Sequence, residues 1–391
     1  MSVTAPAGFR ASGVPAGIKA SGGADLALVV NDGPCDAAAG VFTRNQVQAA
    51  PVLWSRQVLA EGRLRAVVLN SGGANACTGP GGFQDSHATA EQVGAQLGCG
   101  AIGVAVCSTG LIGERLPMGA VRSGVDVAVA ALGSGPESGL AAATAVLTTD
   151  TVPKQALVTS PAGWRVGGFA KGAGMIAPSL ATLLCVLTTD ADVDASTLDA
   201  VLRSATASTF ERLDIDGSCS TNDTVLLLAS GAAGTPVDRT PVDPAEFAAA
   251  VRQVCYDLVR GLQADAEGVT KEVAVVVRGA SREADALVAA RAVARDSLVK
   301  AAFFGSDPNW GRIAAAIGAS PAQVRAETLD VRINGVLLCA GGAAVGGRSA
   351  ADLSGRDILV EIDLHLGDGA ATVLTTDLSH GYVHVNSAYP S

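Results

Sequence analysis

Residues 171–187 have the sequence KGAGMIAPSLATLLCVL, in which a lone lysine, three small residues and a proline precede an apolar run. The run 183–187 predicts a buried strand, because it is short, apolar and bounded by residues that break regular structure. Pro178 stiffens the approach to Ala181-Thr182. Composition alone indicates no more than a threonine, Thr182, at the start of that strand.

The position of Thr182 also suits a nucleophile. A threonine at the head of a buried strand can attack its own preceding carbonyl and break the chain, which frees an α-amino group beside its hydroxyl. Such an amine has a pKa of about 7.7–8.0, which suits a general base at neutral pH. One residue then supplies both nucleophile and base. This chemistry needs no histidine, and the chain contains only four.

Apolar, strand-like runs alternate with alanine-rich helical patterns along the rest of the chain. Strands are predicted at 25–30, 66–69, 102–106, 183–187, 225–228, 273–277 and 358–362, and helices at 86–97, 118–132, 196–212, 246–262 and 282–299. Asp243 before Pro244 predicts a capped start for the fourth of these helices. The alternation predicts a layered α/β architecture without fixing the strand order. The polar residues after Gly279 predict a boundary between a larger domain, 1–279, and a smaller α/β domain, 280–391.

The charge balance limits the classes of partner. The chain has 391 residues with 27 Lys and Arg against 37 Asp and Glu, a net charge of −10. Without a basic cluster it is a poor ligand for nucleic acid or an anionic membrane, so small metabolites are the expected partners. No apolar run approaches the roughly 18–20 residues of a membrane span, and the first residues lack the pattern of a signal peptide. Eight single cysteines favour reduced thiols, and a cytoplasmic protein is expected.

A metal site is not predicted. His380 and His384 have the spacing of two ligands on a helix, but they flank Gly381–Val383, which predicts a turn and a strand. No acidic or thiol ligand nearby in the sequence completes a set.

Several segments together identify a family. The stretch 171–178 with Ala181-Thr182 resembles the self-cleavage signature of the ornithine acetyltransferases, also called glutamate N-acetyltransferases. Further segments are similar to the same family in the same order along almost the whole chain: 108–113 with 116–117, 148–151, 214–217 with 220–223, 265–268 with 270–271, 306–312 and 386–389. A threonine motif alone is weak, whereas this set is specific.

The resemblance implies a two-step acyl transfer. Thr182 is cut free from Ala181, takes the acetyl group of N2-acetyl-L-ornithine and passes it to L-glutamate, in arginine synthesis. It implies no cofactor and no metal. It also implies a layered α/β sandwich with a smaller C-terminal α/β domain, and cleaved halves that stay together as an α2β2 heterotetramer. Some members also use acetyl-CoA as donor, and no residue of this sequence decides that question.

The resemblance also assigns site residues. The Thr109 hydroxyl and the Gly110 amide correspond to the oxyanion hole, which suits a strand end running into a glycine. The positions that hold the amino-acid substrate in the family correspond here to Thr148, Lys171, Thr182, Glu267, Asn386 and Ser391. Lys171 and Glu267 supply the opposed charges that an amino acid requires. The C-terminal tail is thereby expected to return to the active site. The segment 307–312 receives no role.

Alternatives stay open at this point. An N-terminal-threonine amidase or aminopeptidase shares the self-cleavage but passes the acyl group to water. The second alternative is a non-catalytic metabolite-binding protein, in which Thr182 is never released from Ala181. Locally, 108–110 can be a plain turn, Lys171 a solvated loop lysine and Glu267 a charge at a helix end.

Overall fold

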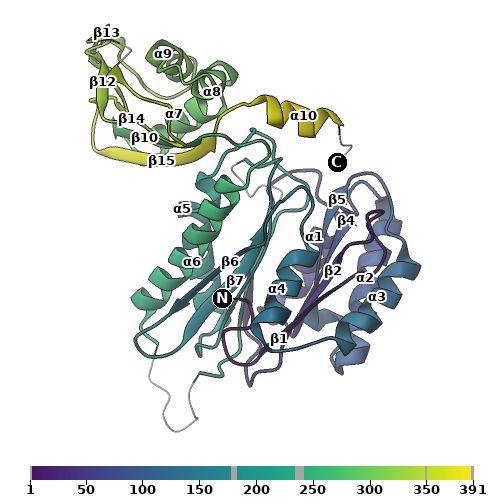
Figure 1. The fold of residues 1–391 in the computed structure, drawn as a ribbon. Coiled ribbons are helices and arrows are strands. Elements are labelled where there is room, and N and C mark those ends of the chain that lie inside the picture. Colours follow the sequence, from purple (N-terminus) through teal and green to yellow (C-terminus); the bar gives the residue numbers. More distant parts are fainter. Residues whose placement is uncertain (1, 178–182, 234–241, 348–349, 389–391) are drawn as a thin grey trace. The chain divides into compact units, whose positions relative to one another are not determined.

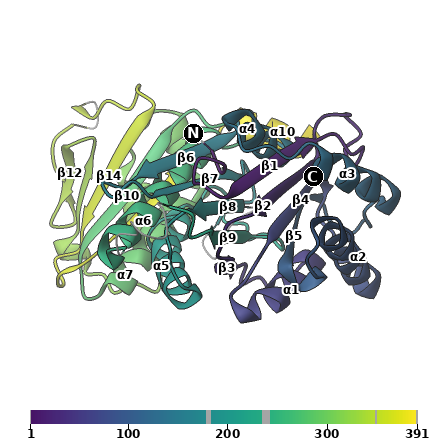
Figure 2. The same cartoon turned by 90° about the horizontal axis from the view of Figure 1, so that it is seen from below.

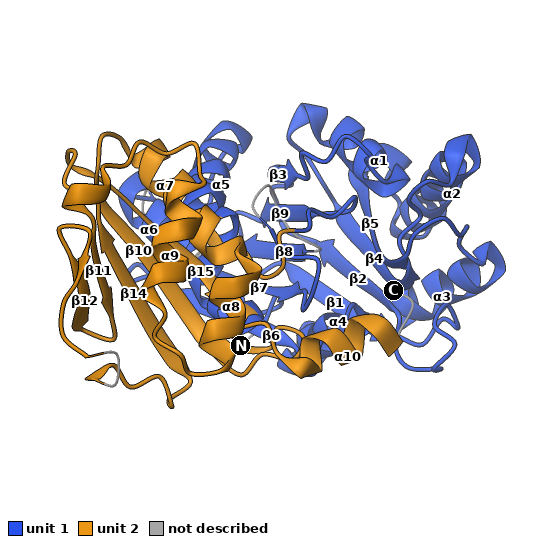
Figure 3. Cartoon of the chain, turned by 90° about the horizontal axis from the view of Figure 1, so that it is seen from above, with its two compact units in different colours: residues 1–211, 218–262, 391 blue, residues 212–217, 263–390 orange. Residues whose placement is uncertain are grey.

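The computed structural model describes residues 2–177, 183–233, 242–347 and 350–388 (Figure 1). The chain forms two compact units, coloured separately in Figure 3. The first contains Met1–Glu211 and Ser218–Leu262, and the second contains Arg212–Gly217 and Gln263–Pro390. Three predicted site residues, Ala181, Thr182 and Ser391, lie outside the described residues.

One sheet of the first unit has four strands in the order β1-β2-β4-β5 (Figure 2). Only the β4–β5 pair is parallel. Helices α1 and α2 pack on β5, α3 packs on β2 and α4 packs on β1. The elements are β1 (Phe9–Val14), β2 (Leu26–Asn31), β4 (Ala66–Gly73), β5 (Val104–Leu111), α1 (Ala50–Val58), α2 (Gly79–Leu97), α3 (Met118–Ala130) and α4 (Pro136–Ala145), with short 3₁₀ helices η1 (Leu59–Glu61) and η2 (Ala101–Gly103).

The second sheet of this unit has five strands in the order β3-β9-β8-β7-β6. The elements are β3 (Ala38–Phe42), β6 (Lys154–Thr159), β7 (Arg165–Lys171), β8 (Leu184–Thr189), β9 (Thr224–Ala229), α5 (Ala195–Ser208), η3 (Phe210–Arg212) and α6 (Pro244–Ala264). Strand β8 is the apolar run predicted from the sequence, and all six of its residues are buried.

Both faces of β8 are covered, which explains why its sequence is apolar without alternation. Leu184 and Val186 belong to an apolar core that also contains Leu28 and Leu69 of the other sheet. Cys185 points to the opposite face, where the Cys255 thiol of α6 is close enough to raise its pKa further after burial has done so. The first unit therefore has two stacked sheets with helices on their outer faces, and the predicted layered α/β sandwich is confirmed.

The second unit contains one mixed sheet, in the order β13-β12-β11-β14-β10-β15. Helix α7 packs on β10 and β15, and α9 packs on β11. The elements are β10 (Glu272–Ala280), β11 (Asp330–Ile333), β12 (Val336–Ala340), β13 (Ala343–Ala344), β14 (Asp357–Asp363), β15 (Gly369–Thr376), α7 (Glu283–Arg295), α8 (Ser297–Phe304), α9 (Trp310–Gly318), α10 (His380–Ala388) and η4 (Ala326–Thr328).

The two units differ from the predicted division into 1–279 and 280–391. Strand β10 spans Gly279 and pairs with β14 on one side and β15 on the other, so its residues belong to the second unit. Pairing between strands distant in sequence decides this, and a local change from apolar to polar residues does not reveal it.

Three helix predictions have instructive outcomes. The capped start is confirmed, since Asp243 accepts backbone hydrogen bonds from Ala245 and Glu246. The single helix predicted over 282–299 is wrong: Asp296 is extended and caps a new helix, α8, through the Val299 N–H. The turn and strand predicted around His380 and His384 are also wrong, because α10 covers both residues. Every helix in the described part of the chain is too short or too polar to cross a membrane.

Candidate active site

The end of β5 carries two predicted site residues. Thr109 is buried, and Gly110 follows it before the strand ends at Leu111. Gly110 has a φ of +127°, and a Cβ there would lie 2.6 Å from backbone atoms of Gly72 and Gly73 in β4. Only glycine fits this approach without moving β4. The interpretation of this segment as a plain turn is therefore wrong, and its role as an oxyanion hole stays a prediction.

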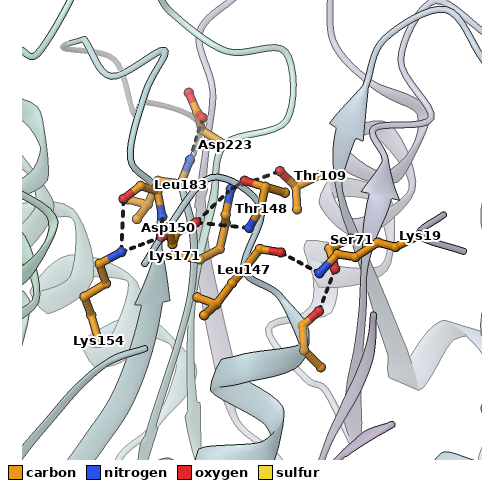
Figure 4. Close-up of polar contacts among 12 residues, drawn as sticks. Lys19, Ser71, Thr109, Leu147, Thr148, Asp150, Lys154, Lys171, Leu183 and Asp223 are labelled. Carbon is orange, nitrogen blue, oxygen red and sulfur yellow. Dashed lines mark hydrogen bonds and ion pairs between the residues drawn. The ribbon is translucent and has the colours of Figure 1, made fainter. Parts of the chain in front are cut away.

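Lys171 is the last residue of β7 and is only 1% exposed. Its ammonium group donates to Thr148 Oγ1 at 2.7 Å and to Thr109 Oγ1 at 3.3 Å (Figure 4). An ammonium has donors only, so both threonine hydroxyls accept from it and keep their own hydrogens for other acceptors. The interpretation of Lys171 as a solvated loop lysine is therefore wrong.

The segment between α4 and β6 carries Thr148, and hydrogen bonds from β4 and from the β1–β2 loop hold its start. Ser71 of β4 donates its hydroxyl to the Ala145 carbonyl at 2.6 Å. The Lys19 ammonium donates to the Leu147 carbonyl at 2.6 Å, as Figure 4 shows. These bonds place Thr148 beside the end of β7. Thr148 is an exposed residue, so a molecule arriving from solvent can approach the hydroxyl group that Lys171 contacts.

Asp150 is the counterion that lets a lysine be buried here. Its side chain is fully buried and lies 2.5 Å from the Lys154 ammonium and 3.7 Å from the Lys171 ammonium. It also accepts the Gly172 N–H at 2.7 Å. Burial alone would raise the pKa of Asp150, but the charges of Lys171 and Lys154 and the hydrogen bonds outweigh it and lower this pKa to about 2. Asp150 is therefore ionised at neutral pH.

Thr109, Thr148, Asp150, Lys154 and Lys171 form what we call the Lys171 cluster. Both ammonium groups lie within ion-pair distance of the one Asp150 carboxylate, and the two threonine hydroxyls lie beside Lys171. The arrangement suits a carboxylate ligand that meets the Thr148 hydroxyl and Lys171. The sequence segment 148–151 contained Asp150, but only the fold shows that it meets two lysines.

Glu267 and Asn386 lie together in the second unit. The Asn386 side-chain amide donates to Glu267 Oε2 at 2.7 Å and to the Tyr382 carbonyl at 3.0 Å. Gly268 makes this pairing possible, because its φ is +65° and a Cβ there would lie 2.1 Å from the Tyr382 nitrogen. Ser379 Oγ donates to the Gly268 carbonyl and holds α10 in place. Glu267 follows the end of α6 by three residues, and its carboxylate is oriented by α10.

The other three predicted site residues, Ala181, Thr182 and Ser391, lie outside the described residues, and their assigned roles stay predictions. A cavity of about 690 Å³ in the first unit is lined mainly by residues of β3, η1 and α5, among them Phe42, Leu59 and Arg203, and by none of the predicted site residues. Within the described ranges, no group of three His, Cys, Asp or Glu side chains is placed to hold a metal ion.

Comparisons with known proteins identify one family over almost the whole chain. Residues 10–391 match the model of the ArgJ family. A protein of Mycolicibacterium paratuberculosis described as arginine biosynthesis bifunctional protein ArgJ is 64% identical over 394 residues, which cover 100% of this chain and 96% of the relative. A protein of Thermobifida fusca with the same description is 56% identical over 389 residues, covering 100% of both chains.

Two solved structures are also similar to this chain. The ornithine acetyltransferase of Mycobacterium tuberculosis, solved with ornithine, is 64% identical and covers 47% of this chain and 96% of its own, with a TM-score of 0.45. The arginine biosynthesis bifunctional protein ArgJ of Bacillus halodurans is 35% identical and covers 52% of this chain and 98% of its own, with a TM-score of 0.49.

Proposed function

The chain belongs to the ArgJ family, and from this premise we propose that it transfers the acetyl group of N2-acetyl-L-ornithine to L-glutamate in arginine biosynthesis. The relatives are named bifunctional, so we include acetyl-CoA as a second donor that supplies the same acetyl group to glutamate. The observation that carries the proposal is the Lys171 cluster, in which the Lys171 ammonium contacts both Thr109 and Thr148, a pair of donors suited to the carboxylate of an amino-acid substrate.

The enzyme first cuts itself between Ala181 and Thr182. The Thr182 hydroxyl oxygen attacks the Ala181 carbonyl carbon, and an ester bond forms as the peptide C–N bond breaks. The hydroxyl proton moves to the released α-amino group. Water then hydrolyses the ester, which leaves the Ala181 carboxylate and a Thr182 with a free hydroxyl and a free amine.

Transfer uses the same hydroxyl twice. The α-amine of Thr182 takes the hydroxyl proton as the oxygen attacks the acetyl carbonyl of acetylornithine, and the ornithine amine leaves with that proton. The amine of glutamate then attacks the acetyl ester, and N-acetyl-L-glutamate leaves as the hydroxyl is restored. Each step passes through a negatively charged oxygen, for which the Thr109 hydroxyl and the Gly110 amide are the donors.

Lys171 supports this assignment of Thr109. Because the ammonium occupies a lone pair of the Thr109 oxygen, the hydroxyl hydrogen is left to point at another acceptor. A nearby cation also makes that hydroxyl a stronger donor. Lys171 thereby serves substrate binding through Thr148 and charge stabilisation through Thr109.

Glu267 and Asn386 supply the opposite charge for the substrate. The resemblance assigns both to the amino-acid ligand, and their 2.7 Å hydrogen bond fixes one carboxylate oxygen of Glu267. An oriented carboxylate is suited to an ammonium group, such as the side-chain amine of acetylornithine. Ser391 completes the set as the resemblance gives it.

The cleaved halves, 1–181 and 182–391, stay together and pair as an α2β2 heterotetramer in the cytoplasm. The five-stranded sheet supports the first part of this proposal. Strand β7 of the first half pairs with β8 of the second from Val166↔Thr189 to Lys171↔Leu184, and β3 pairs with β9 across the same division. A cut between residues 181 and 182 therefore leaves two strand pairs to hold the halves together.

The test is a mass measurement on the cut protein with acetylornithine and no acceptor. An added acetyl group, 42 Da by its formula C2H2O, is expected on the half that begins at Thr182, and adding glutamate should remove it as N-acetylglutamate. Release of acetate in place of N-acetylglutamate would show hydrolysis and favour an amidase. Parallel lines in initial-rate plots are expected from the covalent intermediate.

A further inference from the structure

The segment before β9 joins two parts of the first unit that the proposed reaction uses. Ser220, Thr221, Asn222 and Asp223 are all buried and precede Thr224, where β9 begins. The sequence matched them to the family without giving them a task. Their side chains and backbone bind the end of β5 on one side and the start of β8 on the other.

Asn222 binds the strand end that carries the predicted oxyanion hole. Its side-chain amide donates to the Ser108 carbonyl at 2.8 Å and to the Ala74 carbonyl at 2.6 Å. Its oxygen accepts the Thr221 hydroxyl at 2.6 Å, so the orientation of the amide is fixed. Ser108 directly precedes Thr109, and a shift of that carbonyl therefore moves the Thr109–Gly110 peptide.

Asp223 binds the residue that follows Thr182 in the sequence. Its Oδ1 accepts the Leu183 N–H at 3.1 Å, as Figure 4 shows, and the Thr224 N–H donates to the Leu183 carbonyl at 2.9 Å. Both backbone polar groups of Leu183 are thus held, one by Asp223 and one by Thr224, the first residue of β9. Leu183 is the first described residue after the predicted cleavage site.

The second oxygen of the Asp223 carboxyl bears on which substitution preserves the bond to Leu183. Oδ2 is buried and has no hydrogen-bond partner among the residues that the structure describes. Burial raises the pKa of Asp223 well above its ordinary value, an effect that exceeds the opposing influence of the Leu183 N–H and of the Ser220 and Thr43 hydroxyls. A neutral carboxyl keeps one acceptor oxygen and one O–H, and the amide of asparagine has a similar shape and a similar donor.

We propose that Asn222 and Asp223 are a positioning pair, which aligns the chain at Thr182 with the Thr109–Gly110 donors by holding Leu183 and Ser108 from adjacent residues just before β9. The proposal rests on the proposed self-cleavage and transfer at Thr182. Adjacent residues cannot slide past each other, so the pair fixes a nucleophile and its oxyanion donors in one register. Attack needs such alignment to within a fraction of an ångström.

The opposite ends of the same strands offer matched controls. Asn31 is buried and donates its side-chain amide to two carbonyls, Cys35 at 3.0 Å and Ala229 at 3.1 Å, at the far end of β9. Asp190 is buried and accepts two backbone N–H groups, from Arg165 at 2.7 Å and Ala7 at 2.9 Å, just beyond β8. Both make bonds of the same kind as the pair, away from Ser108 and Leu183.

The experiment compares Asn222→Ala, Asp223→Ala and Asp223→Asn with Asn31→Ala and Asp190→Ala. Intact mass over time gives the rate of self-cleavage, and kcat and KM are measured after cleavage is complete. Asn222→Ala and Asp223→Ala should lower both the cleavage rate and kcat by roughly 10²-fold, the usual cost of a 1 Å misplacement, with KM little changed. Asp223→Asn keeps the acceptor for the Leu183 N–H and should restore both rates.

Controls of equal thermal stability separate alignment from general destabilisation. If Asn222→Ala and Asp223→Ala cleave and turn over as fast as Asn31→Ala and Asp190→Ala with similar melting temperatures, the positioning pair is refuted. Loss of both rates in Asp223→Asn equal to that in Asp223→Ala also refutes it, because a carboxyl is then required for more than holding Leu183. If Asp223→Ala does not fold, Asn222→Ala and Asp223→Asn decide. An unmodified chain that stays uncut refutes the proposed function itself.

Discussion

The Lys171 cluster and the Glu267–Asn386 pair are both assigned to substrate binding, yet water reaches them very differently. Lys171, Lys154 and Asp150 have side chains that are at most 3% exposed, whereas Asn386 is exposed and Glu267 is half-buried. The charges of the first group lie within ion-pair distance of one another, whereas the Glu267 carboxylate of the second accepts a hydrogen bond from the neutral Asn386 amide. Water and salt screen exposed charges far more than buried ones. We therefore expect changes in the Lys171 cluster to alter the stability of the fold and kcat, and changes in the Glu267–Asn386 pair to alter mainly KM.

The largest effect should follow from removing the buried counterion. Asp150→Ala leaves two buried ammonium groups without their carboxylate, and breaking a buried ion pair in this way costs about 3–5 kcal/mol. The free energy of unfolding in urea measures it. Asp285→Ala, which breaks an exposed pair with Arg282, is the matched control and should change little. Equal losses in the two variants would contradict the distinction between buried and screened charge.

The next effect concerns the hydroxyl that Lys171 contacts in β5. Thr109→Ala removes a donor that acts in the transition state, and should lower kcat by roughly 10²–10³-fold, about 3 kcal/mol, with KM changed much less. Cut protein must be used, since self-cleavage passes through a similar species. Thr188→Ala removes another buried strand hydroxyl, bonded to the Val3 carbonyl, and should keep kcat. A near-normal kcat in Thr109→Ala would remove the oxyanion role from the cluster.

Acid should remove part of the stability that the ionised Asp150 gives the cluster. The pKa of Asp150 is about 2 in the folded chain against an ordinary value of 3.8, so its charge stabilises the fold by about 2 kcal/mol above the unfolded pKa. That contribution is lost as the pH falls from about 4 through 2. Urea unfolding of the unmodified chain and Asp150→Asn should therefore differ most near neutral pH, and the difference should shrink in acid. A difference independent of pH would show that the charge of Asp150 is not its source.

The smallest effect should come from the exposed pair. Asn386→Ala removes the bond that orients Glu267, and should raise KM several-fold while stability changes by less than about 1 kcal/mol. Gln253→Ala breaks an exposed bond of the same kind, from an amide to the Asp257 carboxylate on α6, and should leave KM unchanged. A loss of stability from Asn386→Ala as large as that from Asp150→Ala would erase the comparison between the two groups.

How far the sequence could predict this molecule depends on how local each feature is. The strand β8 was predictable, because burial on both faces leaves an apolar run that stands out. The break at Asp296 was not, since a single capping residue inside a helical pattern looks like any other acidic residue. Strand β10 was predicted, but its partners β14 and β15 follow some 80 to 100 residues later, and local patterns do not reveal them.

The site shows the same limit. The resemblance named Lys171 and Thr148, and in the structure Lys171 Nζ lies 2.7 Å from Thr148 Oγ1. It did not name Asp150 as the counterion, because burial of Lys171 at the end of β7 is a property of the folded sheet. The matching segment likewise gave no role to Asn222 and Asp223, because their hydrogen bonds to Ser108 and Leu183 form only in the folded chain.

The central claim, that Thr182 cuts the chain and then serves as nucleophile, is tested most directly by the intact mass of the purified protein beside Thr182→Ala. The unmodified chain should resolve into two masses, residues 1–181 and 182–391, without added protease. Thr182→Ala should give one full-length mass and no transfer of acetyl groups to glutamate. A Thr182→Ala protein cut at the same bond, or an unmodified protein that transfers acetyl groups as a single uncut chain, would contradict the account.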